Sequence, residues 1–173
     1  LKDLLPDSYD KEINNHRWVK VDGKDLILAN INTGVNSHYF LFDYDKKEFV
    51  KQLTKNDGVY GSANFRDNKM VYTFTDPVTP SDIYYTEDWF KAEKRVTETN
   101  PHIKKFKLAK YETIQWKASD GKMVEGILIL PPDYEKGKKY PMIAQLHGGP
   151  ERSYKKYFST SYATYPHVLA GLG

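Results

Sequence analysis

Hydrophobic and polar residues alternate over short stretches in the N-terminal part of the chain, a period that is typical of half-buried β-strands. Four stretches of this kind follow one another, and residues that favour turns lie between them. They span residues 18–21, 25–32, 38–44 and 48–54. Between the first two, Asp22-Gly23 predicts a two-residue hairpin turn. The pattern therefore predicts an antiparallel meander of four short strands.

The same pattern returns 43 residues further on, with no gap needed between residues 25 and 55. Most matched positions are similar in character, and the identities are Val35 with Val78, Asp45 with Asp88, Lys51 with Lys94, and Thr54 with Thr97. A four-stranded unit repeating every 40–45 residues or so, by a rough count, is typical of a β-propeller blade. Because two blades cannot close a ring, a propeller needs further blades. A single antiparallel sandwich of about eight strands is the alternative.

The pattern changes after residue 100. Residues 102–110 predict one or two helical turns, and residues 111–118 and 122–130 predict two strands. Ser119-Asp120-Gly121 between these strands predicts a hairpin turn. Pro131-Pro132 ends the second strand, because proline cannot continue a ladder. A new structural unit is therefore expected in this part of the chain.

The run Met142–Leu146 is mostly apolar on both faces and predicts a buried inner strand. It leads into His147-Gly148-Gly149-Pro150, which predicts a sharp turn. Glycine adopts backbone angles closed to other residues and lets a ligand approach the main chain. Two bare N–H groups beside such a turn can stabilise an oxyanion. From these residues alone, a strand followed by a tight turn without any catalytic role is the simpler interpretation.

Composition excludes several classes of function. Charged residues make up 28% and hydrophobic residues 39% of the 173 residues, which predicts one ordinary domain or two small globular pieces. The net charge is +3 and the lysines are scattered, so solvated faces, Lys155 and Lys156 included, are expected in place of a nucleic-acid surface. No apolar run approaches the roughly 20 residues that cross a bilayer, which predicts no membrane segment.

Cysteine is absent, and the histidines never fall at the spacing of metal ligands, so neither a metal site nor a cofactor is expected. The first residues lack the basic start and long apolar centre of a signal peptide. The absence of cysteine and of any N-x-S/T glycosylation acceptor favours the cytoplasm. The compartment is otherwise not readable from the sequence.

Several short motifs follow the repeated strands. They are Trp116-Lys117-Ala118-Ser119-Asp120-Gly121, Val124-Glu125-Gly126-Ile127-Leu128, Pro131-Pro132-Asp133-Tyr134 and the stretch from Pro141 to Pro150. Over residues 16–173 the chain resembles the prolyl oligopeptidase family of serine peptidases, in the branch of acylaminoacyl peptidases and dipeptidyl-peptidase-like enzymes. The resemblance implies a mixed fold, in which antiparallel β-propeller blades precede the N-terminal strands of an α/β-hydrolase domain. It implies blades over residues 1–100, a linker over residues 101–112 and the start of the peptidase domain over residues 113–173.

The resemblance also implies roles for residues at the glycine corner. The backbone N–H of Gly149 would join an N–H beside the nucleophilic serine to form the oxyanion hole, and Gly148 would give the turn its shape. Arg152 would face the substrate cleft and meet a carboxylate or carbonyl of the peptide, or else lie on the surface. His147 is expected to be structural, with its ring bonded to nearby backbone, because it precedes any nucleophile in chain order. Pro150 replaces the third glycine of the lipase motif, which favours a peptidase.

No serine in the sequence lies in a G-x-S-x-G elbow, and Ser153, close to the corner, lacks the flanking glycines. The Ser-His-Asp triad is therefore expected outside this sequence, and the 173-residue chain alone is expected to hydrolyse nothing. The expected partners are an oligopeptide substrate and the remainder of its own peptidase chain, and exposed strand edges would favour homo-oligomers. The alternative function is a non-enzymatic propeller or sandwich that serves as a binding module. It explains residues 1–100 equally well, but it does not explain the glycine corner.

Overall fold

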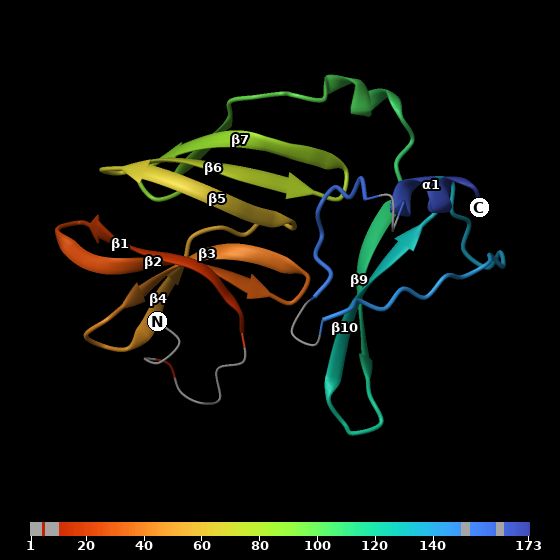
Figure 1. Ribbon diagram of the computed structural model, residues 1–173, viewed down its shortest axis with the longest axis horizontal. Coiled ribbons are helices and arrows are strands. Elements are labelled where there is room, and N and C mark those ends of the chain that lie inside the picture. Colours follow the sequence, from red (N-terminus) through yellow and green to blue (C-terminus); the bar gives the residue numbers. More distant parts are fainter. Residues whose placement is uncertain (1–4, 6–10, 150–152, 162–164) are drawn as a thin grey trace.

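The computed structural model describes residues 5, 11–149, 153–161 and 165–173. Its N-terminal part is two four-stranded antiparallel meanders that lie one above the other (Figure 1). The first unit consists of β1 (Ile13–Val21), β2 (Lys24–Thr33), β3 (Asn36–Asp43) and β4 (Glu48–Gln52). The second unit consists of β5 (Val59–Arg66), β6 (Lys69–Asp76), β7 (Thr79–Glu87) and β8 (Ala92–Arg95). The eight strands predicted from alternation are thus present.

The repeat of 43 residues is visible in the strand pairing. Near the hairpin ends, Thr33 pairs with Asn36 in the first unit and Asp76 pairs with Thr79 in the second, which is the same register at that offset. A bulge between Phe74 and Asp76 then shifts the β6–β7 register by one residue. A bulge of this kind inserts one unpaired residue and bends the strand without changing the meander. The extra residue lies in β7, so beyond the bulge the residues of β7 lie 44 positions after their equivalents in β3, while those of β6 stay 43 positions after theirs in β2.

The two units share one apolar core. The first unit contributes mainly aliphatic side chains and the second mainly aromatic ones. The buried residues of this shared core are Val19, Leu26, Leu28, Tyr39, Leu41, Leu53, Tyr60, Met70, Tyr72 and Phe74. The ring centroids of Tyr60 and Phe74 lie 4.6 Å apart, within the range of favourable aromatic pairs. A parallel bridge between Ser37 of β3 and Val59 of β5 also joins the units into one sheet, so neither unit has to stand alone.

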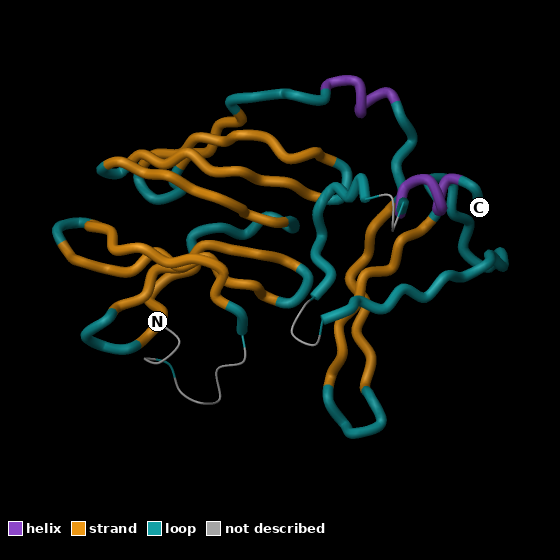
Figure 2. The backbone as a smooth tube through the Cα atoms, viewed as in Figure 1, coloured by secondary structure: helices purple, strands orange, loops and turns teal. Residues whose placement is uncertain are grey.

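Beyond the second unit the chain passes through a short 3-10 helix, η2 (Pro101–Lys105), to a separate two-stranded sheet. This sheet pairs β9 (Lys110–Lys117) with β10 (Met123–Leu130) in an unbroken antiparallel register, as the sequence predicts. The described chain ends in a helical turn, α1 (Pro166–Gly171), packed near β10 (Figure 2). None of the helices in the described ranges is long and apolar enough to cross a membrane.

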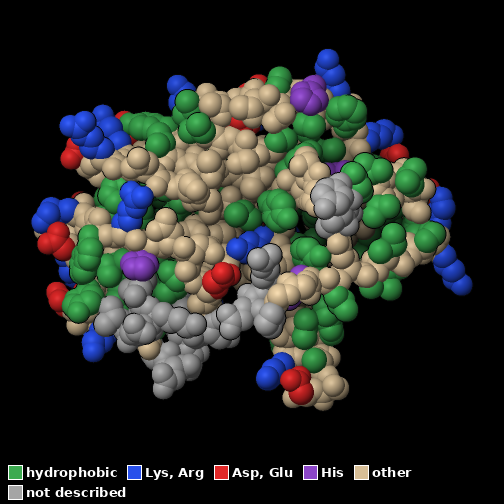
Figure 3. All heavy atoms as spheres, in the orientation of Figure 1, with side chains coloured by type: hydrophobic (Ala, Val, Ile, Leu, Met, Phe, Trp, Pro, Cys, Tyr) green, Lys and Arg blue, Asp and Glu red, His purple; other side chains and the backbone are tan. Residues whose placement is uncertain are grey.

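The predicted strand at Met142–Leu146 is wrong for this structure, where the segment runs as loop. Met142 and Leu146 are 85% and 90% exposed instead of buried. A strand needs a neighbour to receive its hydrogen bonds, and within the described ranges β9 and β10 pair with each other alone. In Figure 3 hydrophobic side chains gather on the right of the view, over the β9–β10 hairpin and the C-terminal part of the chain. A contiguous exposed apolar surface of this kind marks a place where other structure packs.

Candidate functional site

The glycine corner follows the exposed loop and is open to solvent. Gly149 has a φ of +79°, a value that glycine adopts readily and other residues adopt with strain. Its amide lies outside every strand ladder, and among the described residues no hydrogen bond engages it. Gly148 is also exposed, and a Cβ built there would meet nothing within 4 Å. The corner therefore presents main-chain N–H groups to whatever lies in front of it.

Of the other residues predicted at the site, the structure describes His147 but not Arg152. Arg152, Pro150 and Glu151 lie outside the described residues, so the role expected for Arg152 stays a prediction. His147 makes an edge-to-face contact with Tyr154, with ring centroids 5.9 Å apart. The hydrogen bond expected from its ring to nearby backbone is not found among the described residues.

Residues 153–161, which we call the arm, continue from the corner and run between the two units and the β9–β10 hairpin (Figure 1). The arm is fixed to the first unit by Lys156, whose backbone N–H donates to the carbonyl of Val35 over 2.7 Å. The Lys156 ammonium lies 2.9 Å from a carboxylate oxygen of Asp57. Lys156 is only 6% exposed, so its predicted place on a solvated face is wrong. A buried ammonium needs a paired anion, and Asp57 supplies it.

The turn between β2 and β3 receives a second contact from β10. The backbone N–H of Val35 donates to Glu125 Oε1 over 2.8 Å, so both main-chain groups of Val35 bind the C-terminal part of the chain. Gly34, with a φ of +64°, leaves the space that the Glu125 carboxylate occupies. Asn36 also bonds Asp57, and together with Lys156 it keeps the pKa of that carboxyl below its ordinary value. The Val35 turn and Asp57 therefore bind the C-terminal part of the chain with the help of charged side chains.

The turn between β6 and β7 binds the same part of the chain through neutral groups. Thr75 Oγ1 accepts a hydrogen bond of 3.1 Å from the backbone N–H of Phe158 in the arm. The Ala109 N–H donates to His167 Nδ1 over 3.1 Å, so the ring proton lies on Nε2 and donates to the Pro77 carbonyl over 2.9 Å. Burial lowers the pKa of His167, which keeps the imidazole neutral in this place.

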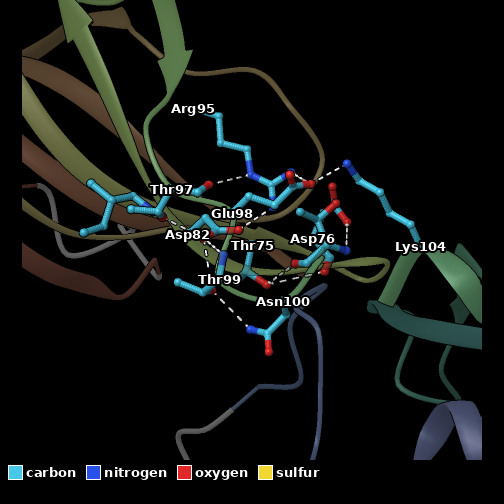
Figure 4. A network of polar contacts seen from close by, with 11 residues as sticks. Thr75, Asp76, Asp82, Arg95, Thr97, Glu98, Thr99, Asn100 and Lys104 are labelled. Atoms are coloured by element: carbon cyan, nitrogen blue, oxygen red, sulfur yellow. Dashed lines mark hydrogen bonds and ion pairs between the residues drawn. The ribbon is translucent and has the colours of Figure 1, made fainter. Parts of the chain in front are cut away.

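The segment that leads out of the second unit is fixed by a buried aspartate (Figure 4). Asp82 accepts hydrogen bonds from the hydroxyl of Thr97 at 2.7 Å and from the N–H of Thr99 at 3.0 Å, and it pairs with Arg95. Burial opposes the ionisation of Asp82, but these hydrogen bonds outweigh it and lower the pKa to about 2. Glu98 continues the network by pairing with Lys104 of η2.

Sequence reasoning did not find the docking residues Lys156, Asp57, Glu125 and His167. Lys156 and Asp57 lie 99 residues apart, and no local pattern joins them. The identity of Val35 with Val78, next to Gly34, is a sequence signal that points to this turn. Position 35 is 5% exposed whereas its repeat equivalent Val78 is 49% exposed, so the identity reflects the turn more than the docking.

No family model matches this chain. The curated relatives include the dipeptidyl peptidase 4 of Arthroderma otae, 27% identical over 141 residues that cover 76% of this chain and 18% of the relative. Another is the dipeptidyl-peptidase 5 of Porphyromonas gingivalis, 28% identical over 111 residues that cover 64% of this chain and 16% of the relative. The chain thus spans about a fifth of the length of the curated relatives it matches.

Solved structures of peptidases share the fold. An acylaminoacyl peptidase of Pyrococcus horikoshii matches 96% of this chain and 24% of its own, with a TM-score of 0.72 and 23% identity. The dipeptidyl peptidase 4 of Porphyromonas gingivalis matches the same shares, with a TM-score of 0.67 and 17% identity. The strand units therefore share the fold of these chains, which is consistent with a β-propeller-like domain. Together with the curated relatives, this confirms the resemblance to a fragment of a prolyl oligopeptidase-family peptidase.

Proposed function

We propose that this chain is part of a serine peptidase that hydrolyses short peptides of the acylaminoacyl or dipeptidyl type. The reaction is Ser-His-Asp acyl transfer, in which serine attacks a peptide carbonyl and water then releases the acyl group. The names of the relatives and the shared fold support a peptidase. The serine, histidine and aspartate belong to polypeptide outside these 173 residues, since no serine here lies in a G-x-S-x-G elbow.

In this proposal residues 1–100 are the last propeller blades, residues 101–112 the linker and residues 113–173 the first part of an α/β-hydrolase domain. The exposed apolar side chains after β10 support this division, because they suit the interior of a larger domain. The remainder of the same peptidase chain would cover them and would supply the strand neighbours that Met142–Leu146 lacks here.

The observation that carries the proposal is the state of the Gly149 amide. Gly149 is exposed, lies outside every strand ladder of the described residues and has a positive φ of +79°. In the peptidase it donates to the oxyanion that forms when serine attacks the scissile carbonyl, and Gly148 shapes the turn. Loss of one such donor typically raises the barrier by about 3–4 kcal/mol. Arg152 is the proposed contact to the substrate.

The test is Gly149→Ala in the complete peptidase that contains this chain. Alanine is strained at positive φ by roughly 1–2 kcal/mol, which turns the N–H away from the oxyanion. We expect kcat to fall about tenfold or more while KM stays near its original value, the signature of a contact made in the transition state. Gly148→Ala is the comparison, and its smaller effect is expected because a Cβ there meets open space. Equal activity of Gly149→Ala and the parent would remove Gly149 from the oxyanion hole.

A second measurement concerns the isolated chain. A serine-directed phosphonate should label the complete peptidase and leave the 173-residue chain unlabelled, because the nucleophile lies elsewhere. The isolated chain should also fail to release chromophore from dipeptidyl and acylaminoacyl anilides. Turnover by the isolated chain that the phosphonate blocks would contradict the proposed location of the triad.

A further inference from the structure

The arm connects the glycine corner to the first unit by contacts between side chains. Tyr154, at its start, packs edge-to-face against His147, the residue just before the two glycines. Two residues further on, Lys156 is bound through its backbone to Val35 of the first unit and through its ammonium to Asp57, in the connection between β4 and β5. Among the described residues, this ring contact joins the fixed part of the arm to the corner.

The attachment of Lys156 is specific in its geometry. Its N–H meets the carbonyl of Val35 at 2.7 Å, and its Nζ meets Asp57 Oδ2 at 2.9 Å. The lysine side chain is 7% exposed, whereas that of Asp57 is 71% exposed. A lysine in such a place loses most of its hydration, so the Asp57 carboxylate, its one ion-pair partner among the described residues, decides whether the charged side chain stays there.

The turn that receives Lys156 is itself held from the other side. Glu125 of β10 accepts the Val35 N–H at 2.8 Å with one oxygen and a hydrogen bond of 2.9 Å from Gln115 with the other. Val35 therefore lies between the arm and the β9–β10 hairpin, with one main-chain group bound to each. The first unit, the arm and the hairpin meet at this one residue.

We infer that Lys156 is a positioning residue for the reaction, held by Asp57. It fixes the arm on the Gly34-Val35 turn, and through Tyr154 and His147 it fixes the orientation of the corner that presents the Gly149 amide. The inference rests on the proposed function, because it assigns a role in placing the oxyanion donor. It makes the first unit a support for catalysis.

The test on the complete peptidase compares Lys156→Met, Lys156→Arg and Lys155→Met. Lys156→Met keeps the length of the stem and removes the charge. We expect it to lower kcat about 10- to 100-fold with KM changed less than about threefold, because a small misplacement of a catalytic group has effects of that size. Lys156→Arg restores the pair with Asp57 and should recover most of the rate. Lys155→Met, next along the arm, should leave kcat within about twofold of the parent.

The position of the corner is read separately from activity, in the 173-residue chain, by the ¹H–¹⁵N signals of Gly149 and the ring signals of His147. Lys156→Met and Asp57→Asn should shift both sets, and Lys155→Met should not. Unmoved Gly149 and His147 signals in folded Lys156→Met would overturn the inference, as would an unchanged kcat. If the complete peptidase proves inactive on peptides, the proposed function fails, while these signals still decide whether Lys156 orients the corner.

Discussion

The chain leaves the two units at equivalent places, residues 52–54 and 95–97, which are distinct from the glycine corner. These two exit corners have the same contacts to the backbone and different charges. In the first unit Thr54 Oγ1 accepts the Tyr39 N–H at 2.9 Å, and in the second Thr97 Oγ1 accepts the Ile83 N–H at 2.9 Å. The residue two positions earlier binds the threonine carbonyl in both cases, Gln52 at 2.8 Å and Arg95 at 3.0 Å. The repeat has therefore kept the corner as a unit of structure.

The difference lies in the buried side chain that faces each threonine hydroxyl. It is His38 in the first unit, at 3.3 Å from Thr54, and Asp82 in the second, at 2.7 Å from Thr97. From the first corner the chain continues directly into β5, whereas from the second it crosses to another sheet. A neutral corner is sufficient where the next strand packs at once. Where the chain departs across a gap between sheets, an ionic network fixes its direction instead.

The largest effect is expected from Asp82→Asn, which breaks the ionic corner while keeping its shape. The amide cannot accept from every donor around the buried Asp82 position, and among the described residues Arg95 keeps only its weaker ion pair, with Glu98 at 3.7 Å. We expect the free energy of unfolding to fall by about 2–4 kcal/mol. Asp25→Asn is the matched control, since Asp25 pairs with Lys20 on the surface at 3.1 Å, and its loss should be below about 1 kcal/mol. Urea unfolding measures both, and equal losses would show that burial of Asp82 contributes nothing.

The sequence predicted those features of the exit corners that depend on local patterns, and it did not predict contacts between residues distant in sequence. The strands and the identity of Thr54 with Thr97 were readable, because alternation and a 43-residue repeat are local patterns. The charged partner of Thr97 was not, because a one-residue bulge makes Asp82 the equivalent of His38 at an offset of 44. Lys156 was misassigned to a solvated face for a similar reason: its partner Asp57 is distant in sequence. Local patterns of polar and apolar residues predict strands and turns. The packing of the arm on the strand units depends on residue pairs such as Lys156 and Asp57, which no local pattern connects.

An exchange between the corners sharpens the comparison. Arg95→Gln gives the second corner the side chain of the first, so the contact to the Thr97 carbonyl can persist while the pair with Asp82 is lost. We expect a loss of about 1.5–3 kcal/mol, the range for a hydrogen bond to a charged group. The reciprocal change, Gln52→Arg, falls at an exposed position and should alter stability by less than about 0.5 kcal/mol. Similar losses for the two variants, measured by urea unfolding, would mean that the ion pair of the second corner adds no stability beyond the neutral contacts of the first.

The smallest effect is expected from acidification, which changes protonation and removes no atoms. Burial lowers the pKa of His38 below its ordinary 6.5, against an opposing effect of Asp57, so on acidification the unfolded chain binds this proton first. The stability that the neutral ring contributes is therefore complete above about pH 6.5 and declines as pH falls below it. For Asp82, whose pKa is lowered from 3.8 to about 2, the contribution persists down to about pH 4 and is lost as pH falls through 2.

The two corners should consequently weaken at different pH values, the neutral one first. Unfolding by urea at a series of pH values tests this order in the parent, His38→Asn and Asp82→Asn. The histidine variant should flatten the pH dependence below about pH 6.5, leaving a residual slope from His167, whose pKa is also lowered by burial. The aspartate variant should flatten it only below about pH 4. If His38→Asn kept the full slope between about pH 6.5 and pH 4, the neutral corner would owe nothing to the uncharged ring, and its difference from the ionic corner would reduce to the Asp82 network alone.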